Sequence, residues 1–205
     1  MNFILIILAC SVIIIGIELL KRRFSLSTNI TRRATHIGTS LVVVIMPLFI
    51  SANQIIIIGL AFAVVLFVGR RYDLFSAIHG VERRTFGEVY LPLGVAITAY
   101  YFLPNNLASF QFGIFIMGIS DALGGLIGEQ FGKHYVHFFG NKKSLEGSVI
   151  FFVSSLVITF LFFPIWGYQV VIVPFILTLT EFSLVYGLDN LILPVLGAFL
   201  ARGLF

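Results

Sequence analysis

The chain has 205 residues, of which 59% are hydrophobic and 11% are charged, and its formal net charge is +4. Soluble domains carry about a quarter charged residues, so this composition excludes an ordinary soluble domain and indicates a membrane protein. The positive charge alone would fit nucleic-acid binding, but the basic residues lie between apolar runs, which excludes nucleic acid as a partner. The single cysteine, Cys10, excludes a disulfide framework.

Eight apolar runs follow one another, most of them close to the length of about 20 residues that a transmembrane helix needs. The runs are 2–20, 34–51, 54–69, 89–103, 107–120, 148–163, 168–186 and 190–205. They predict one membrane-embedded catalytic domain over residues 1–205, an all-α polytopic integral membrane helix bundle with about 7–8 transmembrane segments. The last run contains Pro194 and Gly197, and it either spans the membrane or is re-entrant.

Lysine and arginine occur in alternate connections, and only Arg202 lies outside them. The basic connections are 21–33, 70–84 and 133–143, and the uncharged ones are 51–54, 104–109 and 164–169. The positive-inside rule therefore predicts a multi-pass protein of the cell membrane with basic loops in the cytoplasm and the N-terminus outside. Because the polar groups gather at the cytoplasmic ends and no internal repeat is evident, an enzyme at the cytoplasmic face is favoured over a transporter.

The first polar motif is "TRRATHIG" at residues 31–38. Arg32 and Arg33 lie about one helical turn before His36, so the three side chains share a helix face near the membrane surface. Anchoring by the arginines and a structural histidine would explain the motif, and so would a catalytic role. The run "RRTFGE" at 83–88 repeats the pattern with Glu88 at the start of an apolar run, where a charge-flanked helix start is the alternative.

The segment "SDALGGLIGEQFG" at 120–132 contains Gly124, Gly128 and Gly132 at four-residue spacing. Such a ladder is explained by close helix packing in lipid. Packing does not require Asp121, and a carboxylate in a membrane is costly unless it is used. Asp121 with Gly124, Gly125 and Gly128 therefore predicts a groove for a phosphate-rich ligand and a divalent cation.

The run "NKKSLEGS" at 141–148 directly precedes another apolar run. An interfacial helix start with snorkelling lysines is one explanation. In the functional interpretation, Lys142 and Lys143 bind phosphate oxygens, Ser144 and Gly147 donate hydrogen bonds, and Glu146 is a metal or ribose ligand.

Two further carboxylates lie late in the chain. Glu181 falls inside an apolar run, and Asp189 stands at the end of that run, shortly before Pro194. An ionisable residue inside a membrane segment indicates a functional site.

Together these motifs resemble the CTP-dependent lipid kinases, the family of dolichol kinase, phytol kinase and CTP-dependent diacylglycerol kinase. The matching patterns are R-R-x-x-H at 32–36, R-x-x-G-E at 84–88, D-A-x-G-x-x-x-G-x-x-x-G at 121–132, K-S-x-E-G-S at 143–148 and E…DN…P at 181–194. They occur in the family's order and cover about residues 20 to 195.

The resemblance implies that the protein transfers the γ-phosphate of CTP to a lipid alcohol, with Mg²⁺ as cofactor and the bilayer as its surroundings. Phytol, geranylgeraniol, polyprenol and diacylglycerol stay open as acceptors, with an isoprenoid alcohol favoured. Phosphatidate cytidylyltransferase is the alternative enzyme, although its polar C-terminal signature is missing from "LDNLILPVLGAFLARGLF". A non-enzymatic lipid carrier or small transporter is the alternative outside enzymes.

A mechanism follows as a hypothesis from this resemblance. Asp121, with Glu146 or Asp189, would hold Mg²⁺ on the CTP phosphates, and four basic residues would offset the developing negative charge. Those basic residues are Arg32, Arg33, Lys142 and Lys143. His36 is the candidate base for the lipid hydroxyl, and Glu88 is the competing candidate.

Overall fold

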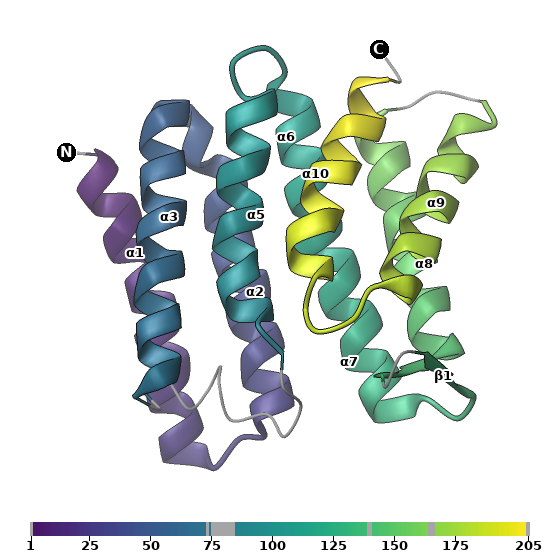
Figure 1. Ribbon diagram of the computed structural model, residues 1–205, viewed down its shortest axis with the longest axis horizontal. Helices are drawn as coiled ribbons and strands as arrows, with labels where there is room; N and C mark the ends of the chain where they lie inside the picture. The colour runs from purple at the N-terminus through teal and green to yellow at the C-terminus, as the bar shows by residue number, and fades with distance from the viewer. Residues whose placement is uncertain (1, 73, 75–84, 139–140, 164–166, 204–205) are drawn as a thin grey trace.

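The computed structural model describes residues 2–72, 74, 85–138, 141–163 and 167–203, and its helical architecture agrees with the all-α prediction (Figure 1). The elements of the first half are α1 (Asn2–Phe24), α2 (Thr28–Ile45), the 3₁₀ turn η1 (Met46–Leu48), α3 (Ala52–Arg71) and α5 (Gly87–Phe102). Those of the second half are α6 (Leu107–Phe115), the π-helix η2 (Ile116–Asp121), α7 (Ala122–Phe131), β1 (Tyr135–Phe138), β2 (Asn141–Ser144), α8 (Leu145–Phe162), α9 (Gln169–Ser183) and α10 (Asp189–Arg202). Arg83 and Arg84, which belong to the second basic connection and the R-x-x-G-E pattern, lie outside the described residues.

Four helical segments are long and apolar enough to cross a membrane, so the chain has the character of a helical membrane protein. They are α1, α3, the continuous segment Leu107–Phe131 formed by α6, η2 and α7, and α8. α9 is apolar but shorter. The larger number of 7–8 spans and the outside N-terminus stay predictions.

Polar side chains start the helices at the ends of the apolar runs. Ser27 Oγ accepts a hydrogen bond from the backbone N–H of Ile30, and Asn106 Oδ1 accepts one from Ser109. Ser51 and Gln54 form a capping box at the start of α3. Such caps satisfy N–H groups that a helix leaves without a partner at its first turn, which explains why short polar stretches are enough to separate long apolar helices.

α10 is wedged between α5 and α6, and two glycines make this packing possible. A Cβ on Gly94 of α5 would collide with the backbone carbonyl of Asn190, and one on Gly113 of α6 would collide with that of Pro194. Small residues let helix backbones approach closely where no solvent drives helices together. The C-terminal helix is thereby fixed in the interior of the bundle, with Leu193, Ala198 and others among its fully buried side chains.

The turn between α9 and α10 lies part-way along the bundle and does not reach its lower end. In Figure 1 this turn lies above the lower ends of α1, α2 and α7. α10 has 14 residues, which corresponds to about 21 Å at 1.5 Å per residue and is shorter than a hydrocarbon core of about 30 Å. The last helices therefore form a short pair whose connection, flanked by Glu181 of α9 and Asp189 of α10, lies inside the outline of the longer helices.

Both chain ends lie at the upper end of Figure 1, and the β1–β2 hairpin lies at the lower end. We therefore expect Asn53, at the start of α3, and Lys133, next to the hairpin, to be on opposite sides of the membrane. Single-cysteine variants Asn53→Cys and Lys133→Cys, made with Cys10→Ala, test this with a membrane-impermeant maleimide on intact and permeabilised cells. The charge pattern predicts that only Asn53→Cys reacts in intact cells; labelling of both from one side would contradict the topology.

Candidate functional site

One cavity of about 420 Å³ connects the polar lower part of the bundle with its apolar interior. Its polar part is bounded by α2, the start of α5, α7, β2 and the α9–α10 turn. The cavity lining includes every predicted site residue except Glu146. Those residues are Arg32, Arg33, His36, Glu88, Asp121, Gly124, Gly125, Gly128, Lys142, Lys143, Ser144, Gly147 and Asp189.

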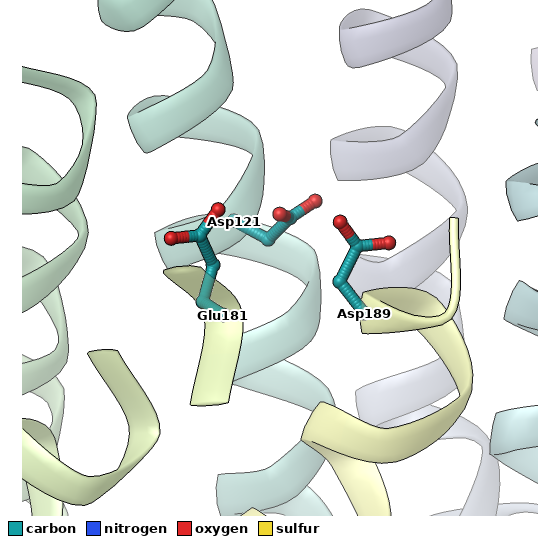
Figure 2. A group of neighbouring side chains, drawn as sticks. All are labelled: Asp121, Glu181 and Asp189. Atoms are coloured by element: carbon teal, nitrogen blue, oxygen red, sulfur yellow. The ribbon is translucent and has the colours of Figure 1, made fainter. Parts of the chain in front are cut away.

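Three carboxylates meet in this cavity. Asp121, Glu181 and Asp189 each offer an oxygen, and these oxygens lie within 4.8 Å of one another (Figure 2). They come from three elements, the end of η2, α9 and the first residue of α10. Asp121 is only 5% exposed, and like charges at this separation repel strongly where water is scarce, so the group requires nearby cations.

Arginine and lysine from distant elements supply that positive charge. Arg33 Nη1 lies 3.2 Å from Asp121 Oδ2, and its Nη2 lies 3.2 Å from Glu129 Oε1. Lys143 Nζ pairs with the Glu181 carboxylate and donates to the Glu181 backbone carbonyl. The arrangement joins α2 to α7, and β2 to α9, through ion pairs at the centre of the cavity.

Asp189 differs from the other two carboxylates. Its Oδ1 accepts a hydrogen bond from the Asn190 backbone N–H at 3.0 Å, and it forms no ion pair with any residue of the described chain. Asn190 Nδ2 donates to the Gly87 carbonyl at 2.8 Å, and the Phe86 N–H donates to the Tyr186 carbonyl at 3.1 Å. These bonds hold the α9–α10 turn against the start of α5 and so place the Asp189 carboxylate.

The π-helix η2 places Asp121, its last residue. A π-turn contains an extra residue relative to an α-turn, so the residues after it are rotated about the helix axis, and such turns are frequent at functional sites. Within η2, Gly118 lies against Ser40 of α2, where a Cβ would collide with the serine side chain. The sequence contains Gly118 three residues before Asp121, but nothing in the pattern predicts a π-helix.

The residues of the motif around Lys143 have different roles in the structure. Ser144 caps α8, because its Oγ accepts the Gly147 N–H at 3.0 Å. Glu146 accepts hydrogen bonds from the backbone N–H of His134 at 3.1 Å and lies 2.7 Å from its ring Nδ1. Lys142 Nζ lies 3.7 Å from the centre of the Tyr135 ring. Glu146 thus lies in the first turn of α8 with its carboxylate bonded to His134, and it is Glu181 that lies beside Asp121 and Asp189.

The glycine ladder faces two ways. A Cβ on Gly124 would lie 3.0 Å from the Gly147 carbonyl oxygen, and a Cβ on Gly128 would lie 2.6 Å from Ser144 Oγ and 3.3 Å from Gly147 Cα. These two glycines therefore pack α7 against α8, as the packing interpretation expects. Gly125 faces α2 instead, where a Cβ would occupy the position of the Arg33 guanidinium.

The two candidate bases have different surroundings. His36 is 6% exposed, and its Nε2 has no hydrogen-bond partner within the described chain. The Glu88 carboxylate is paired with Arg70, which also donates to the Thr85 carbonyl and lies over the Phe86 ring at 4.4 Å. His36 thus lines the cavity and has a buried ring nitrogen that lacks a partner in the described chain, whereas the Glu88 carboxylate is paired with Arg70.

The sequence marked Glu181 as a functional carboxylate but did not place it among the metal ligands, and it did not assign Glu129 to the site. Glu181 carried a usable signal, because it is a carboxylate inside an apolar run. Glu129 follows Gly128 near the end of a helix, where a charged residue is ordinary and gives no signal of function. Its pairing with Arg32 at 3.3 Å and with Arg33 is seen only in the tertiary structure.

Comparison with known proteins finds related sequences but no matching solved structure. No family model and no solved structure matches the chain. It is 28% identical over 203 residues to phytol kinase of Synechocystis sp., with 92% of this chain and 85% of that protein covered. It is also 28% identical over 162 residues to an uncharacterized protein of Methanocaldococcus jannaschii, covering 76% of this chain and 78% of that protein. It is 27% identical over 162 residues to dolichol kinase of Saccharomyces cerevisiae, covering 72% of this chain but 30% of that protein.

The two directions of the glycine ladder predict different effects of alanine. Gly128→Ala places a methyl group against Ser144 and the backbone of Gly147, so we expect a loss of about 1–3 kcal/mol in the free energy of unfolding. Gly125→Ala places its methyl group where the Arg33 guanidinium lies, so it destabilises the protein by displacing that group from Asp121 and Glu129. In an Arg33→Ala background, Gly125→Ala should therefore cause no further fall in the thermal unfolding midpoint in detergent, whereas Gly128→Ala should lower it as much as in the unaltered protein. An equal further fall with both glycine variants in that background would contradict this assignment.

Proposed function

The similarity to phytol kinase and dolichol kinase supports assigning this chain to the CTP-dependent lipid kinase family, and from that premise we propose that it transfers the γ-phosphate of CTP to a lipid alcohol. The cavity itself is the observation that carries this proposal. One end contains carboxylates with arginine and lysine, and the other end is lined by aliphatic and aromatic side chains. A kinase that acts on a lipid needs both environments in contact, because the hydroxyl must meet a triphosphate while the tail stays out of water.

The donor set at the polar end fits a divalent cation and a triphosphate. Mg²⁺ prefers oxygen ligands, and Asp121, Glu181 and Asp189 converge on one point with carboxylate oxygens. A Mg²⁺ ion there would neutralise charge on the CTP phosphates. Glu181 replaces Glu146 in the ligand set proposed from the sequence, because the Glu146 carboxylate is bonded to His134.

Arg33 and Lys143 are the cations placed to bind phosphate oxygens. Both are now paired with carboxylates, Arg33 with Asp121 and Lys143 with Glu181. Phosphate oxygens can therefore replace the carboxylates as partners of Arg33 and Lys143 when a metal ion binds those carboxylates. Positively charged groups fixed beside a transferring phosphoryl group stabilise the charge of the transition state.

His36 is the group we propose as the proton acceptor. In the transfer, the lipid oxygen forms a bond to the γ-phosphorus, the bond from that phosphorus to the β-phosphate oxygen breaks, and CDP leaves. The hydroxyl proton passes to the unpartnered Nε2 of His36, a role for which a neutral imidazole is suited. Glu88 is the less suited of the two candidates because Arg70 holds its carboxylate.

The reaction is tested with purified protein, Mg²⁺, a panel of lipid alcohols, phosphatidate, and CTP labelled at the α- or the γ-phosphate. We expect γ-label in an alcohol and no α-label in any lipid. The α-label in phosphatidate would instead show a cytidylyltransferase. The absence of label in every lipid, with no thermal stabilisation by CTP, would favour a non-enzymatic lipid carrier.

The metal-ligand assignment is tested by a matched pair of variants, Glu181→Gln and Glu146→Gln. Each removes one negative charge with almost no change in volume, but only Glu181 lies with Asp121 and Asp189. We expect Glu181→Gln to lower kcat about 100-fold or more, the scale for losing one electrostatic group of an active site, and to raise the Mg²⁺ concentration needed for half-maximal rate.

Glu146→Gln should keep the Mg²⁺ dependence of the unaltered protein, because its partner is His134. The reverse ranking of the two variants would return Glu146 to the metal site.

Asp121→Ala should abolish turnover while the protein stays folded in detergent, since the variant removes the carboxylate shared by Arg33 and the proposed metal.

A further inference from the structure

The face of α2 that lines the cavity changes from polar to apolar along its length. Asn29, Arg33 and His36 lie toward the lower end, Thr39 follows, and Met46 directly follows the helix at its upper end. Asn29 and Met46 are separated by about 25 Å along the helix axis at 1.5 Å per residue. One helix face therefore leads from the phosphate-binding end of the cavity deep into the bundle.

α3 and α5 continue the apolar part of this cavity. α3 contributes Phe62, Ile58 and Ile55 at helical spacing, and α5 contributes Leu91 and Val95 beyond Glu88. α1 closes another side with Cys10 and Ile14. Since α3 runs opposite to α2, its first turns lie beside the end of α2, and the apolar part is walled by four helices.

The upper end of the cavity is closed by Met46, Ile55 and Val95, which are 1%, 0% and 3% exposed. The whole cavity measures about 420 Å³, including its polar end. This is toward the lower limit of the roughly 300–1,000 Å³ typical of pockets that enclose a drug-sized ligand. A cavity of this size, shared with the polar end, favours one hydrocarbon chain over the paired acyl chains of a diacylglycerol.

We propose that the apolar part of the cavity holds the tail of a single-chain lipid alcohol, and that Met46, Ile55 and Val95 limit the length of that tail. This inference rests on the proposed kinase function and narrows its acceptor to a single-chain alcohol such as an isoprenoid. Ile55 and Val95 are thereby specificity-determining residues that touch the far end of the substrate.

The length limit is tested by Ile55→Ala, with Ile114→Ala as the control. Both isoleucines are 0% exposed and lose the same atoms, but Ile114 does not line the cavity. The measurement is kcat/KM for geraniol, farnesol, geranylgeraniol and phytol. We expect Ile55→Ala to shift the ratio of long to short alcohols by about 10-fold or more, the scale for a change of one methylene in an apolar pocket. Val95→Leu, which adds one carbon at the closed upper end of the cavity, should shift the ratio in the opposite direction.

An unchanged length profile in Ile55→Ala and Val95→Leu, with phosphorylation intact, would overturn the tail site and leave the kinase proposal standing. Equal shifts in Ile55→Ala and Ile114→Ala would overturn it as well. Phosphorylation of diacylglycerol in preference to every single-chain alcohol would also contradict the inference.

A second measurement does not depend on turnover. It compares the thermal unfolding midpoint in detergent with and without geranylgeraniol, because a ligand that binds the folded state raises this midpoint. We expect the alcohol to raise the midpoint of the unaltered protein and of Ile114→Ala, and to raise it less for Val95→Leu. Stabilisation by the alcohol in a protein that phosphorylates no lipid would refute the kinase and retain the tail site, whereas no stabilisation would overturn the tail site.

Discussion

The site depends on the balance between three carboxylates, one buried and two half-buried, and two cations that lie far from them in the sequence. Asp121, Glu181 and Asp189 would repel one another in a poorly hydrated interior without Arg33 and Lys143 beside them. Removing one partner of a buried ion pair typically costs about 3–5 kcal/mol, because the other charge is left uncompensated. The ion pairs consequently fix α2 against α7 and the hairpin against α9, and these elements surround much of the polar part of the cavity.

The sequence was sufficient for the parts of the structure that depend on local pattern. Apolar runs predicted a helical membrane protein, and the isolated polar groups pointed to Asp121, Lys143 and their neighbours because a charge in an apolar segment is expensive. The contacts between segments far apart in the sequence could not be predicted from local pattern. Lys143 meets Glu181 across 38 positions, so the sequence offered no reason to prefer Glu181 over the nearby Glu146 as a partner of Asp121. The π-helix before Asp121 was equally hidden, because one extra residue in a turn leaves no composition signal.

The ion pairs also couple the two ligands that we propose for the site. A metal ion that takes Asp121 leaves the Arg33 guanidinium without its carboxylate partner, and a triphosphate that takes Lys143 leaves Glu181 in the same position. Each ligand alone breaks a buried pair, while both together exchange one set of partners for another. The affinity for either ligand should therefore rise in the presence of the other, and by thermodynamic linkage the factor is the same in both directions.

The short α9–α10 pair has a consequence for the product of the proposed reaction. Its turn lies inside the outline of the longer helices and leads into Asp189 at the start of α10, so the proposed phosphate chemistry would take place deeper in the bundle than the hairpin at its lower end, nearer to the hydrocarbon. A lipid alcohol is stable at that depth because its hydroxyl is neutral. A lipid phosphate is less stable there, since burying its charge away from water is costly unless cations compensate it. Under the proposed function, once CDP and the metal depart, the same depth that admits the alcohol would favour movement of the phosphorylated product toward the headgroup layer, so the direction of release would follow from the length of two helices.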